Sequence, residues 1–298
     1  MIQPYASPYL VADPRAFRVE SAPTTPPPDT DEDAERDALK DLQDELQELQ
    51  RKLAADGRYA LLLVFQALDA AGKDGTIRRV LREANPTGFQ VWSFKRPSEE
   101  ELAHDFLWRT TLRLPPKGTI GVFNRSYYEE VLVVRVHPGY LGRQKLPGRV
   151  ATPTFWSERF RSIREHEEHL ARSGTVVVKF WLHISREEQA RRFLARAEDE
   201  AKRWKFSVGD LAESAHWNDY MAAYEEAIRE TSRPWAPWYV IPADDKGYLR
   251  RATTEVVVGT LRAMDLAFPI LDAEETAQLE RLREEMRAER QASRASLP

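Results

Sequence analysis

Residues 59–77 read Tyr59-Ala-Leu-Leu-Leu-Val-Phe-Gln-Ala-Leu-Asp-Ala-Ala-Gly-Lys-Asp-Gly-Thr-Ile77, and this stretch decides the fold. Its apolar run, Ala60 to Phe65, predicts a strand that is buried on both faces, as in a parallel sheet. A short turn of mostly small residues follows, and apolar residues then recur at helical spacing from Ile77 to Ala84. A strand, a tight loop with Gly-Lys and a helix together predict a phosphate-binding loop.

This loop has the chemistry to hold phosphate. Backbone N–H groups at a helix N-terminus point outward and carry partial positive charge, so they bind anions. Lys73 adds a mobile cation for the same phosphates. A tight strand-to-helix turn without a ligand would show the same residues, and this alternative stays open. The predicted phosphate-binding residues of the loop are Ala70, Ala71, Gly72, Lys73, Asp74, Gly75 and Thr76.

The loop departs from the common pattern G-x-x-x-x-G-K-[ST] at two positions. Ala67 stands where the first Gly is expected, and Asp74 stands where a Ser or Thr normally follows the Lys. The usual hydroxyl ligand for Mg²⁺ is therefore missing. Asp69, inside the loop, is the expected metal ligand in its place, because Mg²⁺ prefers hard oxygen ligands. We expect Mg²⁺ as the cofactor, with Mn²⁺ as the substitute.

The composition is that of an ordinary soluble protein with a large core. The chain has 298 residues, 42% of them hydrophobic and 31% charged, enough for one large domain or two. It contains no Cys, which excludes disulfides, thiolate metal sites and a cysteine nucleophile. No apolar run has the length of a membrane span, and no signal peptide is visible, so we expect a cytoplasmic protein without membrane binding. The formal net charge of -4 argues against nucleic-acid binding, and a polyanionic ligand would need a local basic groove.

Strand candidates alternate with helical segments, which predicts βαβ units and a mainly parallel sheet in an α/β fold. Besides Ala60–Phe65, the strand candidates are Phe89–Phe94, Thr119–Phe123, Thr175–Ile184 and Trp238–Ile241. The helical candidates are about Asp33–Ala55, Thr76–Ala84, Glu99–Arg113, Pro153–Ser173, Arg186–Trp204, Leu211–Thr231, Tyr248–Ala267 and Ala273–Ala292. The first helix carries a leucine stripe from Leu39 to Leu53, which packs either on its own domain or against a partner subunit.

The chain is expected to have a central domain between two flanking regions. The N-terminal region is rich in Pro, which predicts an extended arm or a mobile tail. The C-terminal region is charged on most faces, which predicts a solvated or partner-contacting helix. The predicted boundaries are 1–34 for the arm, 35–270 for the domain, about 185–210 for a lid within it, and 271–298 for the C-terminal helix or tail.

Ligands of open α/β sheets sit beyond the carboxyl ends of the strands, so the residues just after each strand are candidates for chemistry. The residues that follow the strands include many cations and a few carboxylates, which suits several phosphates and a metal ion. Arg has a permanent charge and a planar fork that grips phosphate oxygens in pairs. The candidates after the later strands are Lys95, Arg96, Arg125, Glu129, Glu130, Arg135, Arg191, Arg192 and Arg196.

Three groups of these candidates also have an interpretation without a ligand. Arg125 directly follows a buried strand, where a charge is costly without a partner, so it is either functional or part of a structural ion pair. Glu129 and Glu130 either hold a metal or acceptor or begin a solvated helix, where acids are favourable. The arginine-rich helix after the capping box Ser185-x-x-Glu188 is either a lid that closes on phosphates or a solvated charged face.

Three long stretches and two short runs share their pattern with a known family. They read Ala67-Leu-Asp-Ala-Ala-Gly-Lys-Asp-Gly75, Val122-Phe-Asn-Arg-Ser-Tyr-Tyr-Glu-Glu-Val-Leu-Val-Val-Arg-Val-His137, Lys179-Phe-Trp-Leu-His-Ile-Ser-Arg-Glu-Glu-Gln-Ala-Arg-Arg-Phe193, Arg203-Trp-Lys-Phe-Ser207 and Trp217-Asn-Asp-Tyr220. Over about Leu39 to Ala267 the chain resembles polyphosphate kinase family 2. The resemblance implies a P-loop kinase fold, with a five-stranded sheet between helices, a helical lid and an N-terminal helical extension. It also implies phosphoryl transfer between inorganic polyphosphate and an adenine nucleotide with Mg²⁺.

The resemblance assigns roles by position. Asp69 is then the metal ligand, Lys73 the phosphate-gripping lysine, Arg125 the arginine after the second motif, and Arg192 the preferred lid arginine. Many members of the family have Asp where this chain has Asn124, which removes one carboxylate from the metal site. The candidates for contacting the nucleotide are Glu129, Glu130, Arg135, Arg191 and Arg196, and those for lining the polyphosphate channel are Lys95 and Arg96.

The second motif also resembles the subgroup that accepts both AMP and ADP, with Glu129 as a candidate for acceptor choice. The favoured function is reversible, polyphosphate-dependent phosphorylation of AMP and ADP to ADP and ATP. The alternatives are an ATP-dependent nucleoside monophosphate kinase and a non-catalytic regulator that binds polyphosphate or nucleotide. The leucine stripe and the resemblance together predict a homo-oligomer, a dimer or a tetramer.

Overall fold

The chain forms two compact units, Met1–Leu266 and Ala267–Pro298. The computed structural model describes residues 1–147, 154–200, 209 and 213–295. The predicted boundary at residue 270 lies close to this division, whereas the Pro-rich arm belongs to the first unit. The second unit contains the charged helix α11 (Ala273–Ala295).

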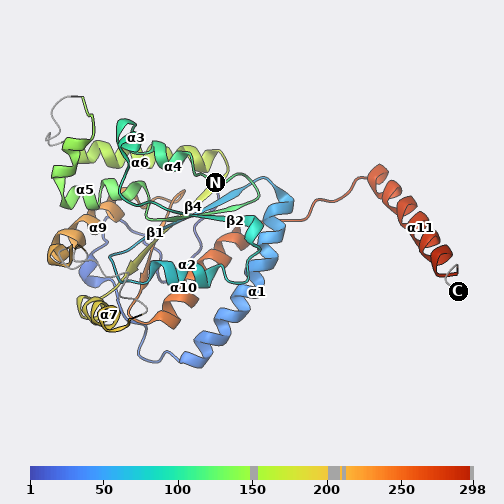
Figure 1. Ribbon diagram of the computed structural model, residues 1–298, viewed down its shortest axis with the longest axis horizontal. Coiled ribbons are helices and arrows are strands. Elements are labelled where there is room, and N and C mark those ends of the chain that lie inside the picture. Colours follow the sequence, from blue (N-terminus) through green and yellow to red (C-terminus); the bar gives the residue numbers. More distant parts are fainter. Residues whose placement is uncertain (148–153, 201–208, 210–212, 296–298) are drawn as a thin grey trace. The chain divides into compact units, whose positions relative to one another are not determined.

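A five-stranded, wholly parallel sheet lies at the centre of the first unit (Figure 1). The strand order is β2-β3-β1-β4-β5, so the apolar run that follows Tyr59 occupies the middle of the sheet. Each predicted strand is confirmed to within one residue at either end. The strands are β1 (Ala60–Gln66), β2 (Phe89–Ser93), β3 (Ile120–Asn124), β4 (Thr175–His183) and β5 (Trp238–Pro242).

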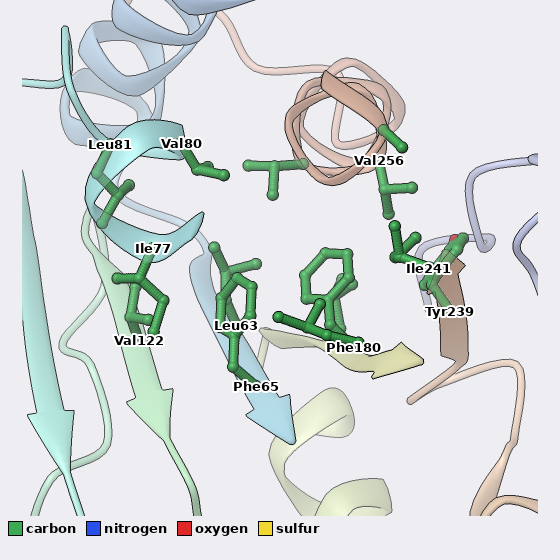
Figure 2. Packing of buried hydrophobic residues seen from close by; sticks show 14 of the residues in the cluster. Leu63, Phe65, Ile77, Val80, Leu81, Val122, Phe180, Tyr239, Ile241 and Val256 are labelled. Atoms are coloured by element: carbon green, nitrogen blue, oxygen red, sulfur yellow. The ribbon is translucent and has the colours of Figure 1, made fainter. Parts of the chain in front are cut away.

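Helices cover both faces of the sheet, because alternate residues of each buried strand point to opposite sides (Figure 1). Leu63 and Phe65 of β1 pack with Ile77 and Val256 on one face, as Figure 2 shows, while Val64 packs on the other. The first face carries α1 (Glu32–Asp56), α2 (Lys73–Val80) and α10 (Lys246–Ala263), and the second carries α6 (Phe155–Arg172) and α9 (Trp217–Thr231).

Helix α1 packs against its own unit, which decides between the two readings of the leucine stripe. Leu39, Leu46 and Leu53 are buried in the first unit, and α1 contacts α10. An ion pair from Arg251 to Glu35, 2.6 Å long, joins the two helices as well. The stripe is therefore used within the chain, and the predicted oligomer needs another surface.

The Pro-rich arm is extended, as one of the two alternatives predicted, and it packs on the first unit. It runs antiparallel beside β5, where Val11 N donates to Trp238 O and Val240 N donates to Tyr9 O. Closer to the N-terminus, the ring of Tyr5 lies against the backbone of α10, and any side chain at Gly259 would collide with this ring. The arm includes a short 3-10 helix, η1 (Val19–Ser21).

The predicted helix over Glu99–Arg113 is wrong in one respect, because it is broken into two. Ser98 caps α3 (Glu99–Ala103) with a reciprocal capping box, and Asp105 then accepts from Leu107 N at 2.9 Å and starts α4 (Trp108–Thr111). The sequence pattern does not predict, or does not separate, the short elements η2 (Pro86–Gly88), η3 (Tyr127–Glu130), α5 (Val133–Val136), η4 (Pro138–Arg143) and η6 (Ser214–His216).

Helix α7 (Arg186–Glu198) begins at the Ser185 cap, as predicted, and Ser185 Oγ accepts from Glu188 N. Residues 201–208 and 210 of the predicted lid, which include the run Arg203–Ser207, lie outside the described residues. Within the described ranges, no helix combines the length and the apolar character that crossing a membrane requires. The cytoplasmic location and the absence of nucleic-acid binding stay predictions.

Candidate functional site

The loop between β1 and α2 has the backbone geometry of an anion cradle. Ala70 and Gly72 have positive φ angles of 64° and 99°. Alternation of left-handed and right-handed residues turns nearby N–H groups toward a common concavity. Gly72 is also the N-cap residue of α2, so the helix N-terminus opens at the same place. The predicted strand-loop-helix unit is thus present at the carboxyl end of the central strand.

Lys73 is held at the mouth of this loop. Its Nζ donates to Ala67 O at 2.6 Å and to Leu68 O at 3.2 Å, and only 8% of the residue is exposed. Burial, reinforced by the charge of Arg125, lowers the pKa of Lys73 to about 8. The ammonium is therefore poorly solvated, which favours its interaction with an arriving anion.

Arg125 has an unusual backbone and two acidic partners. Its φ of 62° is uncommon for a residue with a side chain, and its N–H donates to Phe65 O of the central strand. The guanidinium contacts Asp69 at 2.8 Å and Glu129 at 3.0 Å. The negative charge of Glu129, and to a lesser extent that of Asp69, raises the pKa of Arg125, whereas burial lowers it. Arg125 thus has ion-pair partners, and the same side chain also borders open cavities.

Three cavities meet at Arg125. The largest, about 1090 Å³, spans the phosphate loop, α2 and one face of β2. A second, about 240 Å³, lies among α3, η3 and α5. A small one, about 40 Å³, lies on the side of α9. Arg125 lines all three, Asp69 lines the largest and the smallest, and Glu129 lines the smallest and the one of 240 Å³.

The largest cavity is strongly cationic and is called the phosphate cleft below. Its acidic lining residues are Asp69 and Asp74, and the carboxylate of Asp74 already accepts a hydrogen bond from Asn124 at 2.7 Å. Two of its cations, Arg78 and Arg82, were not predicted, although their spacing of four would put them on one face of the helix predicted over Thr76–Ala84. In the structure Arg78 lies on α2, and Arg82 lies in the turn after it. The basic residues that line the cleft are Lys73, Arg78, Arg82, Lys95, Arg96, Arg125 and Arg196.

The 240 Å³ cavity has a different character and is called the apolar pocket. Aromatic and aliphatic side chains form much of its wall, and Lys95, Arg96 and Arg125 connect it to the phosphate cleft. Such a pocket suits a flat, partly apolar group that carries an anion at one end. Its apolar lining residues are Pro97, Leu102, Phe106, Tyr127, Val133, Val134 and Tyr140.

The five predicted nucleotide-binding residues are not brought together. Glu129 and Glu130 reach the apolar pocket, although Glu130 is buried against Arg159 and burial raises its pKa. Arg135 instead pairs with Glu226 and stacks on Trp156, and Arg191 is exposed and pairs with Glu188. Neither Arg135 nor Arg191 lines any of the three cavities.

Arg192, the preferred lid arginine, does not line the phosphate cleft. Arg192 is buried, and its guanidinium donates to Glu188 and to four backbone carbonyls, including those of Ala70 and Ala71. It therefore faces the back of the loop. Arg196, one helical turn further, lines the phosphate cleft.

Asp69 is the residue that suits a magnesium ion. In the described part of the chain, no three His, Asp or Glu side chains form a ready-made metal cage. In phosphate sites, one or two carboxylates hold Mg²⁺, and substrate phosphates and water complete its coordination. Asp69 supplies such a carboxylate where the cleft and the smallest cavity meet.

Comparison with known proteins identifies closely related sequences. A family model described as polyphosphate kinase 2 (PPK2) matches residues 29–269. An ADP-polyphosphate phosphotransferase of Rhodopseudomonas palustris is 51% identical over 242 residues, which cover 81% of this chain and 84% of that protein. An AMP/ADP-polyphosphate phosphotransferase of Meiothermus ruber is 46% identical over 78% of this chain and 83% of that protein. The crystal structure of polyphosphate kinase 2 from Arthrobacter aurescens TC1 superposes with a TM-score of 0.82 at 36% identity, covering 94% of this chain and 99% of that one.

Proposed function

The chain belongs to the polyphosphate kinase 2 family, and we propose that it transfers a phosphoryl group from inorganic polyphosphate to AMP and to ADP. The observation that carries this proposal is the phosphate cleft, in which seven basic side chains face two acidic ones among the described residues, beside a phosphate loop. A single nucleotide tail does not need so many cations, whereas a polymer with one charge or more per phosphate does. The transfer exchanges one phosphoanhydride for another, so it runs readily in both directions.

The donor end of the site aligns and neutralises the polyphosphate chain. The N–H groups of the loop, Lys73 and Arg125 surround the terminal phosphate, and the remaining cations of the cleft hold the following units. Phosphoryl transfer needs little covalent help from protein, because alignment and fixed positive charge supply most of the acceleration. Arg125 is held rigidly by Asp69 and Glu129, so its charge is already oriented before substrate arrives.

The acceptor enters from the other side of Arg125. The apolar pocket takes the base and ribose, and the acceptor phosphate meets the donor at the junction of the two cavities. An oxygen of that phosphate forms the new P–O bond, while the bond from the terminal phosphorus to the bridging oxygen breaks. The electron pair stays on the shortened polyphosphate. The attacking phosphate is already ionised at neutral pH, so the site needs no strong general base.

Asp69 would hold the magnesium ion at this junction. When bound, Mg²⁺ neutralises charge on the phosphate oxygens of donor and acceptor. The role of Asp69 itself is to provide a hard carboxylate oxygen, which its exposure in the cleft allows. Its ion pair with Arg125 fixes the direction of the carboxylate.

Donor dependence tests the proposal. Purified protein with AMP and Mg²⁺ should form ADP rapidly with polyphosphate and at least 100-fold more slowly with ATP, with Lys73→Ala as the inactive control. Preference for ATP would instead indicate a nucleoside monophosphate kinase. Binding of polyphosphate without turnover from either donor would indicate a non-catalytic regulator.

Acceptor choice is tested separately, because the two relatives named above differ in it. We propose that AMP and ADP are both accepted, with Glu129 at the border of the apolar pocket as the residue that sets their ratio. With polyphosphate as donor, the initial rates with AMP as the sole acceptor and with ADP as the sole acceptor should both exceed the blank. Glu129→Gln should change the ratio of these two rates more than it changes their sum. Activity with ADP but not with AMP would restrict the proposal to ATP formation.

A further inference from the structure

Three successive carbonyls of the phosphate loop accept hydrogen bonds from one distant helix. Gln189 Nε2 of α7 donates to Asp69 O at 2.9 Å. Arg192 Nη1 of the same helix donates to Ala70 O at 3.2 Å and to Ala71 O at 3.0 Å. The two donors lie three residues apart on α7, so they project from one face of it.

These contacts decide where the loop N–H groups point. In a trans peptide the C=O and the following N–H lie on opposite sides of the bond. With the carbonyls of Asp69 and Ala71 directed at α7, the N–H groups of Ala70 and Gly72 are directed away from it. Ala70 and Gly72 line the phosphate cleft, whereas Ala71 does not. The N–H of Ala71 donates to Leu68 O instead.

Arg192 also connects the loop to the segment that follows the edge strand β5. Its Nη2 donates to Ala243 O at 2.7 Å and to Asp244 O at 2.8 Å, just after β5. Its Nε contacts Glu188 at 2.6 Å, which balances the buried charge. A Cβ at Gly72 would lie 3.6 Å from Nη1, in ordinary van der Waals contact with the guanidinium. All of these contacts lie behind the loop.

We propose that Gln189 and Arg192 are positioning residues, which hold the phosphate loop from behind in its anion-binding conformation without touching phosphate. The loop needs such support because Ala70 adopts a positive φ, which is unfavourable for a residue with a Cβ. A lysine could not replace Arg192, since one ammonium has three donors and no planar fork to serve the same acceptors. The inference rests on the proposed function only in taking polyphosphate as the anion.

Hydrogen exchange of the protein without substrate tests the inference independently of turnover. The amides of residues 69–76 should exchange at least tenfold faster in Gln189→Ala and in Arg192→Lys, while amides of the central strand are unchanged. Arg172→Ala is the matched control, because Arg172 makes the same kind of i,i+4 pair with Glu168 on an exposed face of α6. Unchanged exchange of the loop in both variants would overturn the proposal, whatever the enzyme does with polyphosphate.

Kinetics then separate positioning from direct contact. Gln189→Ala removes one neutral hydrogen bond and should raise the KM for polyphosphate about fivefold with a smaller change in kcat, as expected for one net hydrogen bond. Arg192→Lys should raise it at least tenfold, and the double variant should show less than the product of the two effects. Near-normal kinetics of Arg192→Lys together with a large loss in Arg192→Ala would show that the charge itself binds phosphate and would contradict the proposal. Gln189→Ala keeps the test decisive if the arginine variants do not fold.

Discussion

At the scale of single residues, burial sets the working range of Lys73. Its ordinary pKa of 10.5 is lowered to about 8 because the ammonium is poorly solvated. The free enzyme therefore loses this cation above about pH 8, where polyphosphate remains fully ionised. The pH dependence of kcat/KM reports the pKa values of groups in the free enzyme. The kcat/KM for polyphosphate should therefore fall above about pH 8.

Lys73→Arg tests this assignment, because a guanidinium keeps its charge throughout the accessible range. The variant should be slower but should show a flat kcat/KM between about pH 7 and 9.5. A decline near pH 8 that persists in Lys73→Arg would assign the titration to another group. Stopped assays with both enzymes across this range provide the measurement.

Arg125 combines a functional side chain with a strained backbone. A residue with a Cβ at φ 62° costs about 1 kcal/mol relative to Gly. Arg125→Gly and Arg125→Ala both remove the guanidinium, so both should lower kcat at least 1000-fold. Only the Gly variant also relieves the backbone, and it should unfold at higher denaturant concentration than the Ala variant.

Equal stability of the two Arg125 variants would remove the strain argument, while substantial turnover in either would remove the catalytic role. Chemical denaturation followed by fluorescence, together with the polyphosphate assay, distinguishes these outcomes. The positive φ could not be predicted from sequence, because nothing in Asn-Arg-Ser announces a left-handed residue. The position of Arg125 just after a buried strand can be predicted from the sequence, and this position identifies Arg125 as a candidate.

At the scale of elements, a buried network anchors the short helix η3 that carries Glu129. The hydroxyls of Tyr127 and Tyr128 both donate to one oxygen of Glu167 at 2.9 Å, and Lys179 donates to the other at 2.7 Å. Both charged side chains are fully buried. Burial raises the pKa of Glu167 and lowers that of Lys179, while their mutual contact opposes both shifts.

Glu167→Gln breaks this network and leaves Lys179 buried without a counter-charge. We expect a loss of about 3–5 kcal/mol in the free energy of unfolding. Glu168→Gln, on the exposed face of the same helix, should change it by less than about 0.5 kcal/mol. A similar small effect of both variants in urea denaturation would show that η3 does not depend on the network.

The contrast between strands and site residues shows what the sequence could reveal at this scale. Apolar runs and turn residues are local signals, and they located each strand to within one residue. The ends of parallel strands converge, so the meeting of Asp69, Lys73 and Arg125 at one cleft also followed from order along the chain. The partners of Arg135 and Arg192 depend on side-chain direction and on loops far away in sequence, so their placement required the three-dimensional structure.

At the scale of the whole molecule, the two units differ in how far stability depends on them. Tyr9 of the arm is buried, and its hydroxyl donates to Tyr248 of α10 at 2.8 Å. Tyr9→Ala should therefore cost about 3 kcal/mol of unfolding free energy.

A chain that ends at Leu266 should retain the melting temperature of the first unit to within about 2 °C, because that unit has its own core. Calorimetry of both variants is the measurement, and the reverse ranking would contradict this view.

The strand-like contact of the arm has a further consequence for the protein at high concentration. β5 is the outermost strand on its side of the sheet, and without residues 9–11 its amides and carbonyls would face solvent unpaired. An unprotected sheet edge is a template on which other chains add strands and aggregate. The Pro-rich segment covers that edge with residues of the same chain, so a shortened protein that lacks the arm should precipitate sooner than one that keeps it.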